Sequence, residues 1–122
     1  MRVPLALIST AAIMANLLPS ASYSGEPSLT VGAGARSCAQ FAQDYAASPD
    51  IMENLYFTWA QGYLTGFARA SRSETKLKPS SRDEKWQKSF VREYCGTHPL
   101  SPYSEAVAAL NLDLIKFHLG VE

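Results

Sequence analysis

Cysteine and histidine are scarce in this sequence, which contains two of each among its 122 residues. Cys38 and Cys95 do not form a Cys-x-x-Cys pair, so a catalytic dithiol is not expected. His98 and His118 lie far apart, and neither stands in a metal-ligand spacing such as His-x-x-x-His. No nucleophile is visibly paired with a base. We therefore expect no metal site, no cofactor and no enzyme activity.

Net charge is also absent, because eleven Lys and Arg balance eleven Asp and Glu. Proteins that bind nucleic acid usually carry a basic surplus, so a nucleic-acid partner is not expected. Gly32 and Gly34 stand close together, but no Lys-Ser or Lys-Thr follows them at the spacing of a phosphate-binding loop. Nucleotide binding through such a loop is therefore not expected either.

Only one long apolar run is present, over residues 3–18, and small residues follow it. A basic start, an apolar run and small residues form the pattern of a secretory signal peptide, with cleavage after Ser22 or Ser24. A membrane anchor is the alternative, but it needs about 20 apolar residues, and this run is shorter and contains Pro4. We expect a signal peptide over residues 1–22, a periplasmic or secreted location, and no membrane span after cleavage.

Export changes the expectation for the two cysteines, because oxidising compartments favour disulfides. Cys38 and Cys95 allow a single pairing, which would close a loop of about 58 residues worth roughly 4 kcal/mol in the chain-entropy model. A domain of about 100 residues is only marginally stable without such help. Two free, buried thiols are the competing interpretation.

The pattern of the remaining residues predicts mainly helices. Residues 23–36 are rich in Gly, Ser and Pro, and we expect a flexible lead-in there. Apolar residues then recur at helical spacing, without repeats or strand-like alternation. The expected helices cover residues 38–46, 51–70, 81–95 and 101–118. The prediction is an all-α fold: a small four-helix bundle over residues 37–122, stapled by one disulfide.

Capping residues mark the expected helix ends. Ser37 is the expected N-cap of the first helix. Asp50 and Ser81 each precede a Glu by three residues, which predicts capping boxes at the second and third helices. Gly96 is the expected left-handed stop of the third helix.

Residues 51–70 form the most apolar expected helix, with apolar side chains around more than half of its circumference. We expect the other helices to wrap it. Trp59, Gly62, Tyr63 and Gly66 are its core motif, and the two glycines predict a notch where another helix or an aromatic ring comes close. An alternative is that some of the aromatic rings line a groove for a peptide or an apolar ligand.

Charge is unevenly distributed along the chain: residues 69–92 contain eight basic and three acidic side chains. The simple interpretation is a solvated loop and helix face. The alternative is a docking patch for an acidic protein partner or for lipid head groups. The candidate patch residues are Lys76, Lys78, Lys85, Lys88 and Arg92.

Several motifs together carry a family resemblance. They are Cys38 in the first helix, Trp59-x-x-Gly62-Tyr63 in the second, Tyr94-Cys95 followed by Pro99, and Ala106, Ala108 and Ala109 in the last helix. Over residues 37–115 this pattern resembles the HdeA/HdeB type of small periplasmic proteins. The resemblance implies a helical fold with one disulfide at equivalent positions. It also implies an acid-stress chaperone that binds unfolded client proteins.

Other functions remain open at this point. The Gly62-Tyr63-x-x-Gly66 and Tyr94-x-x-x-His98-Pro99 features are similar to Tai-type immunity proteins, which protect bacteria from type VI secretion toxins but usually have another cysteine arrangement. A toxin-neutralising or inhibitor-type binding protein is therefore the main alternative. An envelope structural protein without a discrete site is a third hypothesis, and a homodimer is a further option.

Overall fold

A computed structural model of the protein describes residues 30–71 and 82–121. These residues form a short 3-10 helix and four α-helices, and no strand occurs among them. The prediction of an all-α fold with four helices is confirmed. The expected signal peptide, Ser81, Lys76 and Lys78 lie outside the described residues. The elements are η1 (Gly32–Ala35), α1 (Cys38–Ala47), α2 (Pro49–Ala70), α3 (Glu84–Thr97) and α4 (Tyr103–Leu119).

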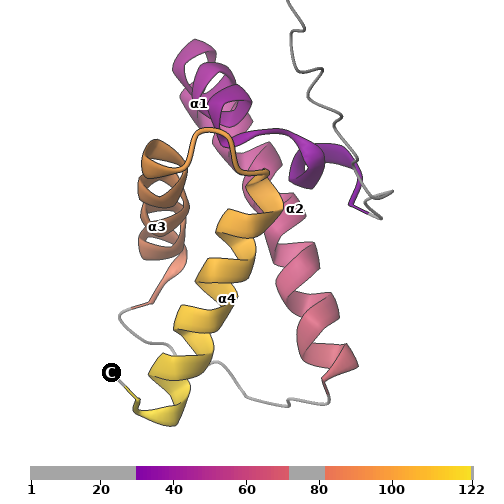
Figure 1. Cartoon of the computed structure of the whole chain (residues 1–122), viewed down its shortest axis with the longest axis vertical. Coiled ribbons are helices and arrows are strands. Elements are labelled where there is room, and N and C mark those ends of the chain that lie inside the picture. Colours follow the sequence, from indigo (N-terminus) through magenta and orange to yellow (C-terminus); the bar gives the residue numbers. More distant parts are fainter. Residues whose placement is uncertain (1–29, 72–81, 122) are drawn as a thin grey trace, which may run out of the picture.

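The helices pack around α4, which lies in the front of Figure 1 with α3 on one side and α2 on the other. Helix α1 crosses one end of the bundle and packs against α2, α3 and α4. The segment η1 packs against α2 and α4. In contrast, α2 and α3 hardly approach each other. Their facing sides are therefore joined by side chains and not by close helix packing.

Three aromatic rings form the centre of the core. Phe41 of α1, Tyr56 of α2 and Tyr103 of α4 are all buried. Their ring centroids lie 4.9 to 5.1 Å apart in tilted or edge-on arrangements. Such contacts add roughly 0.5–1.5 kcal/mol per pair beyond the burial of area. This cluster fixes α1, α2 and α4 relative to one another.

The predicted disulfide between Cys38 and Cys95 is present, and both cysteines are buried. It joins the first turn of α1 to the last turn of α3. The connector between α3 and α4 passes over the same end of the molecule (Figure 1). Its carbonyl groups cap α1: Cys38 N donates to Ser101 O at 2.8 Å, and Ala39 N donates to Pro99 O at 2.9 Å. The disulfide and these backbone bonds hold one end of the bundle together.

The ends of α1 and α4 follow the sequence signals. Ser37 is the N-cap of α1, and its hydroxyl accepts a hydrogen bond from Gln40 N at 3.1 Å. Gly120 ends α4 in the left-handed conformation, with φ of 67°. The Ser37 cap depends on residues next to one another in the chain, which is why the sequence predicts it.

Helix α2 begins differently from the prediction. Ser48 is its N-cap, Pro49 occupies the first turn, and no side chain caps the helix by a hydrogen bond. The predicted capping box between Asp50 and Glu53 is therefore wrong. Because α2 starts at Pro49, Asp50 lies inside its first turn and is not the N-cap. Glu53 instead pairs with Arg92 of α3.

Both predicted ends of α3 are also corrected. Asp83 is the N-cap, and its Oδ1 accepts a hydrogen bond from Trp86 N at 2.8 Å. The helix thus starts later than the box at Ser81 predicts. Gly96 is not a left-handed stop, because α3 continues through it to Thr97 and its φ is not positive. The Thr97 hydroxyl bonds back to Tyr94 O at 3.0 Å, so local polar contacts end this helix in place of glycine.

The expectation that other helices wrap α2 is wrong in part. Only three residues of α2 are buried, and Ile51 and Leu55 are 67% and 53% exposed. These two side chains lie on the side of α2 opposite the buried Tyr56 and Ala60, so the bundle does not cover them. Among the described residues, no atom lies within 4 Å of a Cβ added at Gly62 or Gly66. The predicted notch at these two glycines is therefore wrong.

Candidate functional site

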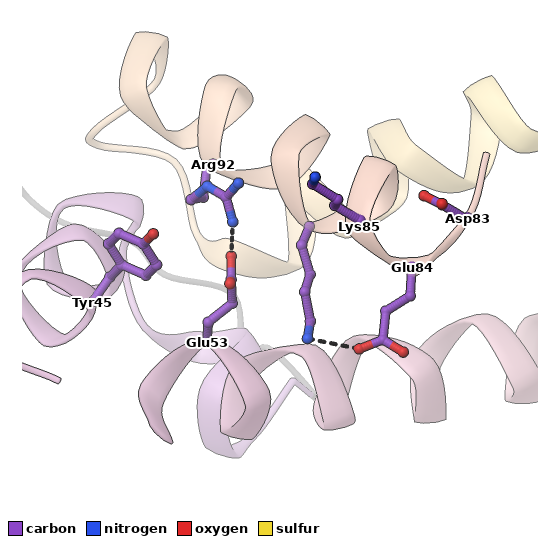
Figure 2. A pocket seen from close by; sticks show the side chains of 7 residues that line it. Tyr45, Glu53, Asp83, Glu84, Lys85 and Arg92 are labelled. Carbon is purple, nitrogen blue, oxygen red and sulfur yellow. Dashed lines mark hydrogen bonds and ion pairs between the residues drawn. The ribbon is translucent and has the colours of Figure 1, made fainter. Parts of the chain in front are cut away.

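A shallow, open groove lies between α2 and α3 among the described residues, and we call it the α2–α3 groove (Figure 2). It consists of two neighbouring hollows of about 570 and 360 Å³, and Glu84 borders both. Tyr45, Glu53, Asp83, Glu84, Lys85, Lys88 and Arg92 line the larger hollow, and Asn54, Phe57, Thr58, Gln61, Glu84 and Gln87 line the smaller one.

Polar side chains connect the two walls of this groove. Figure 2 shows Glu53 of α2 directed toward Arg92 of α3, with Tyr45 of α1 beside them. The cross-groove pairs are Glu53 with Arg92, Asn54 Oδ1 with Lys88 Nζ at 2.8 Å, and Gln61 Nε2 with Gln87 Oε1 at 3.2 Å. Contacts of this kind are individually weak when water reaches them. The walls are therefore held less firmly than the aromatic core.

Lys88 crosses the floor of the α2–α3 groove. Its ammonium group lies 2.7 Å from Glu84 Oε1 and 5.2 Å from the ring centroid of Phe57. Phe57 is buried beneath it. The ammonium group thus lies over the Phe57 ring while polar partners on both walls satisfy its charge.

This geometry changes the interpretation of the expected basic patch. Lys88 and Arg92 are both engaged in ion pairs, and only Lys85 of the three described patch residues is mostly exposed. Three acidic residues, Glu53, Asp83 and Glu84, line the same hollow. The described part of the patch is therefore a balanced groove and not a surface of positive charge.

Two buried tyrosines have raised pKa values. The Tyr56 hydroxyl donates to Asp44 Oδ2 at 2.7 Å, and burial together with this acceptor raises the pKa of Tyr56 to about 12. Burial, with a smaller effect of the nearby Glu53 carboxylate, also raises the pKa of Tyr103. Both phenols therefore stay protonated near neutral pH. Their role here is in the core and its hydrogen bonds.

The two histidines do not come together with other metal-ligand residues. The ring of His98 stacks on Tyr94 at 4.1 Å, and that of His118 lies edge-on to Phe117 at 6.1 Å. Within residues 30–71 and 82–121, no group of three His, Cys, Asp or Glu side chains could hold a metal ion. In the same part of the chain, no helix is both long enough and apolar enough to cross a membrane.

The core motif is only partly brought together. Trp59 and Tyr63 stack with ring centroids 5.8 Å apart, whereas Gly62 and Gly66 lie on the exposed side of α2. The partner of Trp59 is η1, which the sequence places in the flexible lead-in. That expectation does not hold for residues 32–35, because Ala33 and Gly34 are buried. The run of small residues at 32–35 is the one signal for such close packing.

Comparisons of this chain with protein-family models, with curated proteins and with solved structures found no match. The resemblance to the HdeA/HdeB type therefore rests on the sequence motifs alone. What it implies about function stays a hypothesis.

Proposed function

We propose that this chain is a small exported helical protein that binds unfolded client proteins at low pH, as the acid-stress chaperones that it resembles do. One observation carries the proposal: three ion pairs that join separate elements all depend on a carboxylate. They are Arg36 with Asp44, Arg82 with Asp113 and Arg92 with Glu53. The first pair joins the residue that follows η1 to α1. The second joins a residue just before α3 to α4, and the third joins α3 to α2.

Acid would remove the negative partner of each pair. Carboxylates become neutral as pH falls to about 2 to 3, while the ten Lys and Arg that remain after removal of residues 1–22, Arg2 included, keep positive charge together with two His. The lost pairs and the resulting repulsion both favour a looser bundle. The disulfide would still hold α1 to α3. The expanded protein would therefore stay compact at one end and open elsewhere.

Opening would expose surface that could bind a client. The α2–α3 groove is a favourable place for it, because its walls are joined by polar contacts above the buried Phe57. Apolar side chains are already exposed elsewhere on α2, at Ile51 and Leu55. An unfolded client in acid also exposes apolar surface, so association would be driven by the hydrophobic effect.

The test compares Glu53→Gln with Glu93→Gln. Glu53 pairs with Arg92 across the groove, whereas Glu93 is exposed on the same helix as Arg92. Binding of the dye bis-ANS is followed from pH 7 to pH 2, together with aggregation of an acid-denatured test protein such as lactate dehydrogenase. We expect dye binding and protection to begin below about pH 4 in the wild type, and at higher pH in Glu53→Gln only. If the wild type neither binds dye nor suppresses aggregation down to pH 2, the proposal is wrong.

A binding module that blocks a toxin or an enzyme is the rival. Its docking surface would include Lys85, which is exposed, but Lys88 and Arg92 are already paired. A stable partner captured at neutral pH and lost on Lys85→Glu would favour this rival over the chaperone proposal.

A further inference from the structure

We propose that the face of Trp59 covered by η1 is a peptide-binding surface, and that residues 31–35 of the chain occupy it as an internal ligand. The proposed ligand is a peptide segment of an unfolded chain that is rich in Gly and Ala. One of its glycines would lie against the indole ring. This inference rests on the proposed function for its biological ligand, but binding at Trp59 can be tested by itself.

The first observation is how closely backbone lies on the ring. A Cβ added to Gly34 would lie only 2.0 Å from Trp59 Cζ2 and 2.2 Å from Cη2. Real Cβ atoms do not approach carbon so closely, so a glycine is required where the chain crosses the ring. The φ of Gly34 is not positive, which means that the ring and not the backbone conformation imposes this requirement.

The second observation is a polar contact beside the ring. Trp59 Nε1 donates a hydrogen bond to Val31 O at 3.0 Å. An aromatic ring with an adjacent donor can hold a backbone segment through one carbonyl, provided that a glycine stands where the chain crosses the ring. The contact with η1 is therefore of a kind that a backbone segment from another chain could make.

The third observation is that the surface does not depend on η1 for its support. Trp59 stacks on Tyr63 of its own helix and meets Tyr103 of α4 edge-on, at centroid distances of 5.8 and 6.2 Å. Tyr103 in turn belongs to the buried aromatic core. The indole would thus keep its position if η1 moved away.

The contacts that attach η1 to the bundle include an ion pair, and acid would neutralise its carboxylate. At its C-terminal side, Tyr103 N donates to Arg36 O at 2.7 Å, and the Arg36 guanidinium lies 3.3 Å from Asp44 of α1. Asp44 also accepts the hydrogen bond of Tyr56 from α2.

The titratable groups around this attachment come from every neighbouring element. They are Arg36 before α1, Asp44 on α1, Tyr56 and Glu53 on α2, Arg92 on α3 and Tyr103 on α4. Between pH 7 and pH 2, only the two carboxylates among them change charge. Protonation of Asp44 leaves Arg36 without its counter-ion and favours release of η1.

The test uses the full chain with Trp86→Phe, which leaves Trp59 as the single tryptophan. The probe is the peptide Thr-Val-Gly-Ala-Gly-Ala-Arg, equal to residues 30–36, and the control peptide has Val in place of its second Gly. Gly34→Ala displaces η1, whereas Gly62→Ala adds the same methyl group where no described atom lies within 4 Å. Peptide binding is followed by Trp59 emission at pH 7 and pH 3.

We expect the peptide to bind Gly34→Ala at least ten-fold more tightly than Gly62→Ala at pH 7, and to bind the Gly62→Ala protein at pH 3. The Val peptide should bind at least ten-fold more weakly. Equal binding of both peptides, or equal binding by both proteins at pH 7, would overturn the inference. If Gly34→Ala does not fold by circular dichroism, Asp44→Asn decides: it should bind the peptide at pH 7, and binding no stronger than that of Gly62→Ala refutes the proposal.

The outcome separates this inference from the proposed function. Peptide binding without client protection at any pH would remove the chaperone proposal and leave the Trp59 surface. Client protection that excess peptide does not reduce would leave the chaperone proposal and place the clients elsewhere, which would overturn the assignment of Trp59 as their binding surface.

Discussion

Removal of the disulfide should be the most damaging covalent change in this fold. Cys38 and Cys95 are 57 positions apart, and the loop that they close contains α1, α2 and most of α3. For a loop of about 58 residues, the chain-entropy model gives roughly 4 kcal/mol of stabilisation. Stability of a small domain is typically about 5–15 kcal/mol. The double variant Cys38→Ala/Cys95→Ala should therefore lose a large share of it.

Urea denaturation followed by circular dichroism measures this loss. With a slope of roughly 1–3 kcal/mol per molar urea, a loss of about 4 kcal/mol lowers the midpoint by roughly 1.3–4 M. The reduced wild type keeps both sulfur atoms in the buried site, so it controls for the cavity that the alanines leave. Both proteins should unfold far below the oxidised wild type. A decrease of less than about 1 kcal/mol in both would refute the reasoning that this link restricts the unfolded chain.

Four further substitutions have clear expected directions. Gly62→Ala and Gly66→Ala should each raise the free energy of unfolding by roughly 0.5–1 kcal/mol, because both glycines are exposed to solvent in the middle of a helix. A decrease in the urea midpoint would contradict this expectation. Leu110→Ala should cost about 2–5 kcal/mol, since Leu110 is fully buried, and a cost below about 1 kcal/mol in the same assay would contradict this. The pKa of Tyr56 is about 12 in the folded protein and 10.0 in the unfolded chain. The stability linked to this difference is fully present below pH 10 and is lost as the pH rises from 10 to about 12. Urea midpoints from pH 8 to 12 should therefore fall less steeply in Tyr56→Phe, and parallel curves would count against it.

The buried stripe of α4 illustrates what periodicity predicts well. Val107, Leu110 and Leu114 recur at helical spacing and are all buried. Spacing along one helix determines which side chains share a face, and a face rich in apolar residues packs inward.

Helix α2 shows where the same reasoning fails. Its apolar side chains cover more than half of the wheel, yet Ile51 and Leu55 remain exposed because no helix lies over them. The role of Glu53 was also missed, since its partner Arg92 is 39 positions away. Periodicity reports which residues share a face, but not whether another element covers that face.

For the candidate site, the sequence points to Trp59, Tyr63 and the basic residues of α3 but not to their partners. The pairing of Arg92 with Glu53 depends on where α3 lies beside α2, whereas Lys88 pairs with Glu84 one turn away on α3 itself. The contact between Gly34 and Trp59 joins residues from a Gly-rich stretch and from a helix. Such contacts arise only when separate elements meet.

The sequence by itself determined the four helices, the cap at Ser37 and the single cysteine pairing, because these depend on neighbouring residues, periodic spacing or the number of cysteines. Tertiary structure decided which side of α2 is covered, that η1 lies on Trp59, and that Arg92 of α3 pairs with Glu53 of α2 across a groove. The physical reason is that burial and charge pairing depend on distances between elements, and packing of the whole chain sets those distances.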